Sequence, residues 1–122
     1  MSFNLRKGLR YEARARDYLL AHGLRLLEAN FRCRFGEIDL IMEHADCVCF
    51  VEVRYRESLD YGGASASITR VKQRRIVKAA LFYLSRHTRL AQRALRFDAL
   101  LLQREADDRL GFDWIQNAFY AE

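Results

Sequence analysis

The chain has 122 residues, of which 51% are hydrophobic and 12% aromatic, and its formal net charge is +5. This length suits one compact domain over residues 1–122, and the hydrophobic content excludes an intrinsically disordered chain. No apolar run reaches the roughly 20 residues needed to cross a bilayer, and the first residues, MSFNLRKGLR, lack the apolar core of a secretory signal. We therefore expect a cytoplasmic protein without a membrane partner.

Apolar periodicity, glycines and polar turns predict seven elements of secondary structure. In chain order these are a helix over 4–22, a strand over 24–33, strands over 37–42 and 47–56 that form a hairpin, a helix over 67–87, a strand over 94–104 and an edge strand over 112–119. The segment 57–67 is predicted as a loop beside the hairpin. The order αβββαββ predicts an α/β fold in which helices flank a central mixed sheet.

Three carboxylates, Glu37, Asp39 and Glu52, interrupt the two apolar runs of the predicted hairpin. Strand interiors are depleted in acidic residues because an unpaired charge is costly to bury, so acids that persist there usually meet a cation. If the turn is centred between residues 45 and 46, the numbers of paired residues add to 91 and Asp39 lies opposite Glu52. Carboxylates on such a pair, with Cβ atoms about 4.5–5.5 Å apart, repel each other unless a divalent ion or a shared proton intervenes.

Two alternatives to a metal site follow from the same spacing. A turn centre shifted by half a residue places the two acids on opposite faces of the hairpin. In the second alternative the hairpin face is exposed, and Arg54 and Arg56 neutralise Glu37 and Glu52 in water. The apolar neighbours on both strands favour a covered strand pair, and with it the metal site.

Residues 64–96 contain nine basic side chains and no acidic one. The nine are Arg70, Lys72, Arg74, Arg75, Lys78, Arg86, Arg89, Arg93 and Arg96. A single-sign run of this kind indicates a surface that binds polyanions, with nucleic acid as the first candidate. Phosphate contacts of this type give affinity with little sequence selectivity. The alternative is a solvated basic face without a partner.

The sequence GEIDLI, followed by FVEV and a basic residue, resembles the signature of the YraN-like family of small bacterial proteins. The similarity runs from Gly8 and Glu12 through Asn30, the hairpin and the second helix to the sequence RFD at 96–98. The resemblance implies a restriction-endonuclease-like core, related to archaeal Holliday-junction resolvases of the PD-(D/E)XK nuclease superfamily. It further implies that Asp39 and Glu52 bind Mg²⁺ or Mn²⁺, and that Glu12 is the additional acid contributed by a helix.

Arg54 occupies the position at which that superfamily carries a lysine, two residues after the second acid. Arginine stays charged and cannot act as a base, although its guanidinium can hold a phosphate oxygen or stabilise the charge of a transition state. Lys72, on the following predicted helix, is a candidate to compensate by reaching the site. The alternative for Lys72 is an ordinary surface position on a basic helix.

These observations predict a metal-dependent endonuclease that hydrolyses phosphodiester bonds in DNA, with branched DNA among its candidate substrates. Asp39, Glu52, the carbonyl of Val53 and Glu12 are the expected metal ligands, and Arg54 is expected to contact the scissile phosphate. The side chains expected to hold the nucleic-acid backbone are Arg56, Arg70, Lys72, Arg74, Arg75 and Lys78.

Two other functions stay open at this point. The first is a non-catalytic nucleic-acid-binding module on the same scaffold, with catalysis lost because Arg54 replaces the lysine. The second is a protein-interaction subunit that uses the predicted edge strand near Trp114. Resolvase-like relatives imply a two-fold homodimer, for which the sequence shows no interface.

Overall fold

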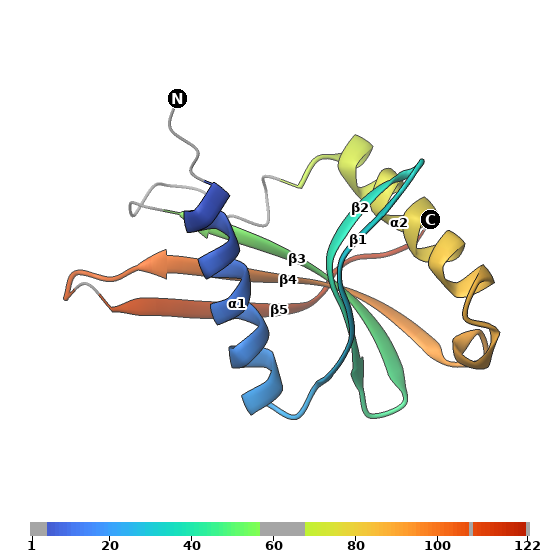
Figure 1. Ribbon diagram of the computed structural model, residues 1–122, viewed down its shortest axis with the longest axis horizontal. Helices are drawn as coiled ribbons and strands as arrows, with labels where there is room; N and C mark the ends of the chain where they lie inside the picture. Colours follow the sequence, from blue (N-terminus) through green and yellow to red (C-terminus); the bar gives the residue numbers. More distant parts are fainter. Residues whose placement is uncertain (1–4, 57–67, 108, 122) are drawn as a thin grey trace.

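The computed structural model describes residues 5–56, 68–107 and 109–121, with side chains from Arg10 onward. Figure 1 shows two main helices packed on one five-stranded sheet. The helices are α1 (Leu5–Ala21) and α2 (Arg70–Ser85), and a short 3₁₀ helix, η2 (Thr88–Leu90), follows α2. The strands are β1 (Arg25–Cys33), β2 (Gly36–His44), β3 (Cys47–Arg56), β4 (Ala94–Arg104) and β5 (Leu110–Phe119).

The strands lie side by side in the order β1-β2-β3-β4-β5. The pair β3 and β4 is parallel, whereas each of the other three neighbouring pairs is antiparallel. Parallel strands need a crossover that returns the chain to the same end of the sheet, and the segment that contains α2 supplies it. The predicted order αβββαββ and the central mixed sheet flanked by helices are therefore confirmed.

The two helices cover opposite faces of the sheet, because side chains alternate between faces along its central strands. Phe50 of β3 is buried in the cluster that also contains Ile76 of α2. Its neighbour Val51 is buried in the other cluster, together with Leu19 of α1. Figure 1 shows α1 crossing the sheet over β3, β4 and β5, while α2 lies beside β1 and β2. β3 thus lies between two apolar layers, as its run of hydrophobic residues predicts.

Both helices end or begin at residues suited to these positions. Gly23, with a φ of 92°, follows α1 in the left-handed conformation that glycine adopts without strain. The hydroxyl of Thr69 accepts a hydrogen bond of 3.1 Å from the backbone N–H of Lys72 and so caps the N-terminus of α2. The helix predicted over residues 67–87 is shorter in the structure: its sixteen residues, Arg70–Ser85, start after this cap.

The β2–β3 turn is tighter than the sequence predicts. Both strands run up to it, so that Ala45 and Asp46 alone connect His44 to Cys47, and Ala45 has a φ of 55°. Glu43, predicted in a polar connection, is instead a strand residue that is only 5% exposed. Its carboxylate forms ion pairs with Arg25 and Arg93, which make its burial tolerable.

Two further predictions concern the periphery of the fold. The edge strand β5 begins at Leu110, two residues earlier than predicted, because its pairing with β4 continues to the end of that strand. The predicted loop over 57–67 lies outside the described residues. Neither main helix, as far as the chain is described, has the length and apolar character needed to cross a membrane.

Candidate active site

The register of the β2–β3 hairpin brings Asp39 and Glu52 together. The pairs Leu40–Val51 and Ile41–Phe50 have residue numbers that add to 91, as predicted. One step further in the same register, Asp39 comes next to Glu52, on the face that α2 covers. The backbone N–H of Val53 donates a hydrogen bond of 2.8 Å to Oδ2 of Asp39. The alternative in which the two acids lie on opposite faces is therefore wrong.

The pKa of Asp39 is raised from 3.8 to about 7. Burial is the largest cause, because a low-dielectric environment disfavours the charged form, and the negative charges of Glu52 and Glu12 add to it. The hydrogen bond from Val53 and the positive charge of Lys72 act in the opposite direction without cancelling the rise. Near neutral pH this carboxyl group therefore exchanges a proton readily, and a cation that binds beside it competes with that proton.

Glu52 is buried and pairs with cations from two elements. Its side chain is 6% exposed, and Nζ of Lys72 lies 2.7 Å from its Oε2 atom. Nε of Arg54 lies 3.7 Å from the same oxygen and has no hydrogen-bond acceptor among the described residues. Lys72 reaches this site because α2 begins at Arg70, after the capping residue Thr69, which places Lys72 in its first turn. Lys72 therefore contacts the hairpin acid Glu52, as a lysine that compensates for Arg54 must, and its catalytic role stays a prediction.

Glu12 approaches the same carboxylates from α1. Its pKa is raised, first by partial burial and then by the negative charges of Glu37 and Glu52, while a hydrogen bond with Asn30 and the charge of Arg32 lower it. The influence of Glu52 on Glu12, and of Glu12 on Asp39, shows that the three acids share one electrostatic environment. The helix acid singled out by the sequence thus belongs to the same region as the hairpin acids.

The donor chemistry of this region fits a hard divalent cation with few protein ligands. In the described parts of the chain, no group of three or more His, Cys, Asp or Glu side chains is arranged to hold a metal ion. Asp39 and Glu52 provide a pair of carboxylates, and Mg²⁺ is commonly bound by one or two carboxylates together with waters and substrate phosphates. Burial is the main cause of the raised pKa of Asp39, and a cation between the two groups would relieve the repulsion from Glu52 that adds to it.

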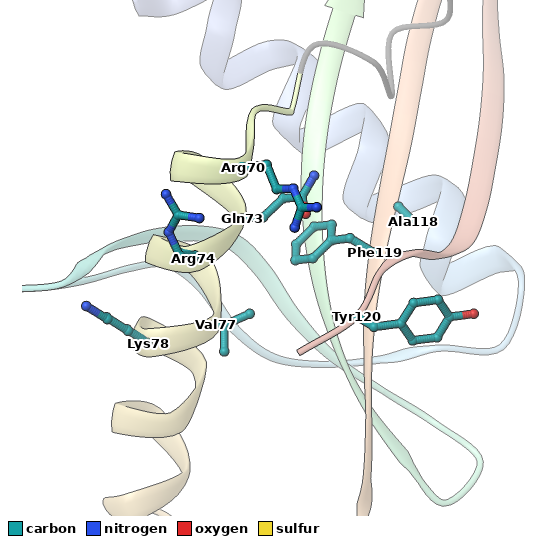
Figure 2. A pocket seen from close by; sticks show the side chains of 8 residues that line it. All are labelled: Arg70, Gln73, Arg74, Val77, Lys78, Ala118, Phe119 and Tyr120. Carbon is teal, nitrogen blue, oxygen red and sulfur yellow. The ribbon is translucent and has the colours of Figure 1, made fainter. Parts of the chain in front are cut away.

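The basic side chains of α2 do not all lie on one surface. Arg70, Arg74 and Lys78, spaced by four residues, line a hollow of about 440 Å³ between α2 and the end of β5. Figure 2 shows these side chains with Phe119 and Tyr120, which approach from β5 and the residue after it. Other predicted nucleic-acid contacts lie elsewhere. Lys72 turns toward Glu52, Arg75 is exposed and packs near Gly36, and Arg56 ends β3.

A buried carboxylate outside the site has a structural role. Asp98 is 0% exposed, and its oxygens accept hydrogen bonds of 2.9–3.1 Å from the guanidinium of Arg96. Nε1 of Trp114 donates a bond of 3.0 Å and the backbone N–H of Asn117 one of 3.1 Å. These partners join β4 to β5, so Asp98 holds the edge strand in place.

The sequence analysis did not single out a second group of arginines. Arg10 and Arg14 of α1, Arg104 of β4 and Arg109 line another hollow on the side of the sheet that α1 covers. The first two are four residues apart and so lie on one face of a helix, which is a signal that the sequence does contain. The other two are far away in the chain, and their approach depends on the pairing of β4 with β5.

Comparisons with known proteins identify relatives of the whole chain. A profile of the uncharacterised protein family UPF0102 matches residues 11–102. The chain is 51% identical over 119 residues to a UPF0102 protein of Alkalilimnicola ehrlichii, covering 97% of this chain and 90% of that protein. It is 47% identical over 119 residues to a UPF0102 protein of Nitrosomonas eutropha, covering 98% of this chain and 97% of that protein. The family to which the hairpin signature points is thereby confirmed.

One solved structure has a weaker likeness. The structure of SfsA from Pyrococcus furiosus in complex with Ca²⁺ matches 85% of this chain with 14% sequence identity and a TM-score of 0.38. This chain spans 62% of the SfsA chain. A likeness at this level carries no argument about fold or function.

Proposed function

The chain belongs to the uncharacterised protein family UPF0102, and we propose that it is a metal-dependent endonuclease that hydrolyses phosphodiester bonds in DNA. The observation that carries the proposal is the grouping of Asp39, Glu52 and Lys72 at one end of the β2–β3 hairpin. Two carboxylates beside a lysine on a central strand pair are the arrangement implied by a restriction-endonuclease-like core, the fold we propose for this sheet. Branched DNA is one candidate substrate.

Asp39 and Glu52 are the residues that would hold Mg²⁺ or Mn²⁺, with the carbonyl of Val53 as a further oxygen donor, and Glu12 would orient a water molecule beside the ion. When bound, such an ion lowers the pKa of water and offsets the negative charge that develops on phosphate. The N–H of Val53 orients the carboxylate of Asp39 through the hydrogen bond already present. Asp39 must lose its proton to bind a cation, so activity is expected to rise as the pH increases through about 7.

In this proposal Lys72 performs the catalytic role of the motif lysine, whose position in the sequence is occupied by Arg54. Its ammonium group lies within hydrogen-bond distance of Glu52, so it is held at the site where a water molecule would attack phosphate. A lysine can hold or release a proton at Nζ, which arginine cannot do at neutral pH. Arg54 keeps a permanent charge with Nε lacking a hydrogen-bond acceptor among the described residues, and it would hold a phosphate oxygen.

The basic face of α2 would hold the backbone on one side of the cleavage site. Arg70, Arg74 and Lys78 form one stripe along α2, while Lys72, between the first two in the chain, points to a different side of the helix and contacts Glu52. Phosphate contacts of this kind predict salt-sensitive binding with little sequence preference. We further propose that the protein is cytoplasmic and forms a homodimer. Analytical ultracentrifugation would measure its mass in solution and so test the dimer.

A second candidate function is a nucleic-acid-binding module without catalysis. It is favoured by one observation: Lys72 and Arg54 already offset the charge of Glu52, so the site is partly neutralised by the chain itself. In this case Arg54 and Lys72 have a structural role, and nucleic acid binds to α2 alone. The two functions differ in whether divalent ions bind at Asp39.

Cleavage tests the first function directly. We would incubate the protein with Mn²⁺ and labelled duplex, single-stranded and branched DNA, beside the variants D39N, K72M and D113N. Asp113 is exposed on β5, so D113N is a matched control that removes a carboxylate away from the site. We expect D39N to abolish cleavage, K72M to lower it about 10²-fold or more, and D113N to leave it unchanged. Equal cleavage by D39N and the parent protein would refute the proposed site.

A second measurement separates enzyme from binding module. A cation that binds only the folded state raises the unfolding midpoint with increasing ion concentration. The endonuclease proposal predicts this stabilisation by Mn²⁺ for the parent protein and for D113N, and its absence in D39N. No cleavage and no stabilisation, with salt-sensitive DNA binding intact, would establish the binding module instead. The variant R54K adds a further comparison. A large gain in cleavage would mean that Arg54 has lowered the catalytic activity of the site, and a loss would mean that Arg54 itself contributes to cleavage.

A further inference from the structure

A second basic hollow lies on the side of the sheet that α1 covers. We call it the α1 groove, and it is lined by Arg10, Tyr11, Arg14, Arg104, Arg109 and Leu110. Its volume is about 410 Å³. The arginines come from α1, from the end of β4 and from the residue that precedes β5, so three parts of the chain contribute to one surface. The basic face of α2 belongs to the opposite side of the sheet.

The charges of the α1 groove have one sign. No carboxylate lines it in the described part of the chain, although Asp107 pairs with Arg109 at 2.6 Å in the adjoining turn. Arg10 and Arg14 are one helical turn apart, and like charges at this spacing destabilise a helix by a small amount. An anion in the groove would remove this repulsion. The planar fork of a guanidinium matches the geometry of phosphate oxygens, which makes phosphate the ligand that four arginines fit best.

Aromatic rings connect the groove to the carboxylate site. Tyr11, which lines the groove, stacks on Tyr55 with ring centroids 3.9 Å apart and planes inclined by 13°. Nε of Arg104 lies 3.5 Å from the hydroxyl of Tyr55. In the chain, Tyr11 precedes Glu12 and Tyr55 follows Arg54. The groove and the candidate active site are therefore adjacent along α1 and β3, although Tyr55 and Arg54, as neighbours on a strand, point to opposite faces of the sheet.

We propose that the α1 groove binds the phosphodiester backbone of a single-stranded nucleic-acid segment. Proteins that bind single strands combine a positively charged groove with aromatic side chains on which bases stack. The α1 groove has the positive charge, and Tyr11, itself stacked on Tyr55, supplies one aromatic ring in its lining. A hollow of about 410 Å³ has the size of a small-ligand site, which suits one or two nucleotides and not the width of a duplex. The proposal rests on the proposed function in one respect, since it names a second contact with the nucleic acid that enters the carboxylate site.

The test measures binding without metal, so that it succeeds or fails independently of cleavage. A fluorescein-labelled 15-nucleotide oligothymidine is titrated with the full chain in EDTA at several salt concentrations. The test variant is R10E/R14E, and the matched control is R32E/R34E, which makes the same change in net charge at two exposed residues outside the groove and outside the basic run 64–96. We expect R10E/R14E to weaken binding at least tenfold and to reduce the slope of log K against log salt by about 1.4, the value for two lost single-strand phosphate contacts. The control should change binding less than threefold.

Further variants and competitors make the outcome decisive. R104E/R109E alters the groove from the sheet side, and it should weaken binding to a similar extent even if the helix variant folds poorly. Equal weakening by R32E/R34E would overturn the proposal in favour of a diffuse electrostatic attraction, and unchanged binding by both groove variants would exclude the groove. Inorganic phosphate and thymidine monophosphate test for a free-anion site. If either binds the groove as tightly as the oligonucleotide does, the proposal of a nucleic-acid strand is wrong.

Discussion

Asp39 is expected to reduce the stability of the folded protein at neutral and alkaline pH, and replacing it with asparagine should reveal the cost. Its pKa rises from 3.8 to about 7 on folding, because of burial and the charge of Glu52. Above pH 3.8 the unfolded chain has lost this proton, while the folded protein retains it up to about pH 7. Raising the pH across this window therefore favours the unfolded chain. The D39N side chain is neutral, and its amide oxygen can still accept the hydrogen bond from Val53.

The magnitude follows from the width of this window. Each pH unit over which the folded state alone holds a proton is worth about 1.4 kcal/mol, so three units set a ceiling of about 4 kcal/mol. Burial of the asparagine amide in the variant has a cost of its own, which takes back part of this gain. We expect D39N to raise the free energy of unfolding by about 1–3 kcal/mol at pH 8. The gain should shrink steadily toward pH 4, where the carboxyl group of Asp39 is protonated in the folded state.

Urea denaturation of the parent protein and D39N at a series of pH values between 4 and 8 provides the measurement. D113N serves as the control, because an exposed carboxylate should change stability by no more than about 0.5 kcal/mol at any pH. A D39N variant that is destabilised at pH 8, or whose effect does not depend on pH, would refute the reasoning about the carboxylate pair. The expected result would show that Asp39 lowers the stability of the folded protein, which is typical of a residue at a functional site.

Three further predictions concern stability. K72M should destabilise the protein by about 1–3 kcal/mol because Glu52 loses its 2.7 Å partner, and the double variant K72M/E52Q should recover most of this loss in urea denaturation. D98N should cost about 3–5 kcal/mol because it removes a buried charge that pairs with a guanidinium; the fluorescence of Trp114 reports this unfolding, and a change below 1 kcal/mol would contradict the structural role. A45G should stabilise the protein by about 0.5–1 kcal/mol, because glycine adopts a φ of 55° without the penalty that alanine has there; a lower thermal midpoint would show that the turn is not strained.

The sequence alone determined the features that depend on local spacing. Side chains alternate strictly along a strand, and a two-residue turn sets the register of a hairpin, so the approach of Asp39 to Glu52 followed from the position of one turn. The order of helices and strands followed from apolar periodicity in the same way. The prediction placed Glu43 wrongly because its charge resembles that of a turn residue, whereas two arginines distant in the chain pair with it inside the sheet.

Only the tertiary structure decided which distant residues join the carboxylates. Twenty residues separate Glu52 from Lys72, and their contact depends on how α2 packs on the sheet. The raised pKa of Asp39 likewise depends on how much water the packed layers exclude, which no spacing rule contains. The α1 groove is a third case, since Arg14 and Arg104 approach only when α1 lies across β4. Spacing rules act over a few residues of one element, while contacts between elements depend on the burial of whole apolar faces.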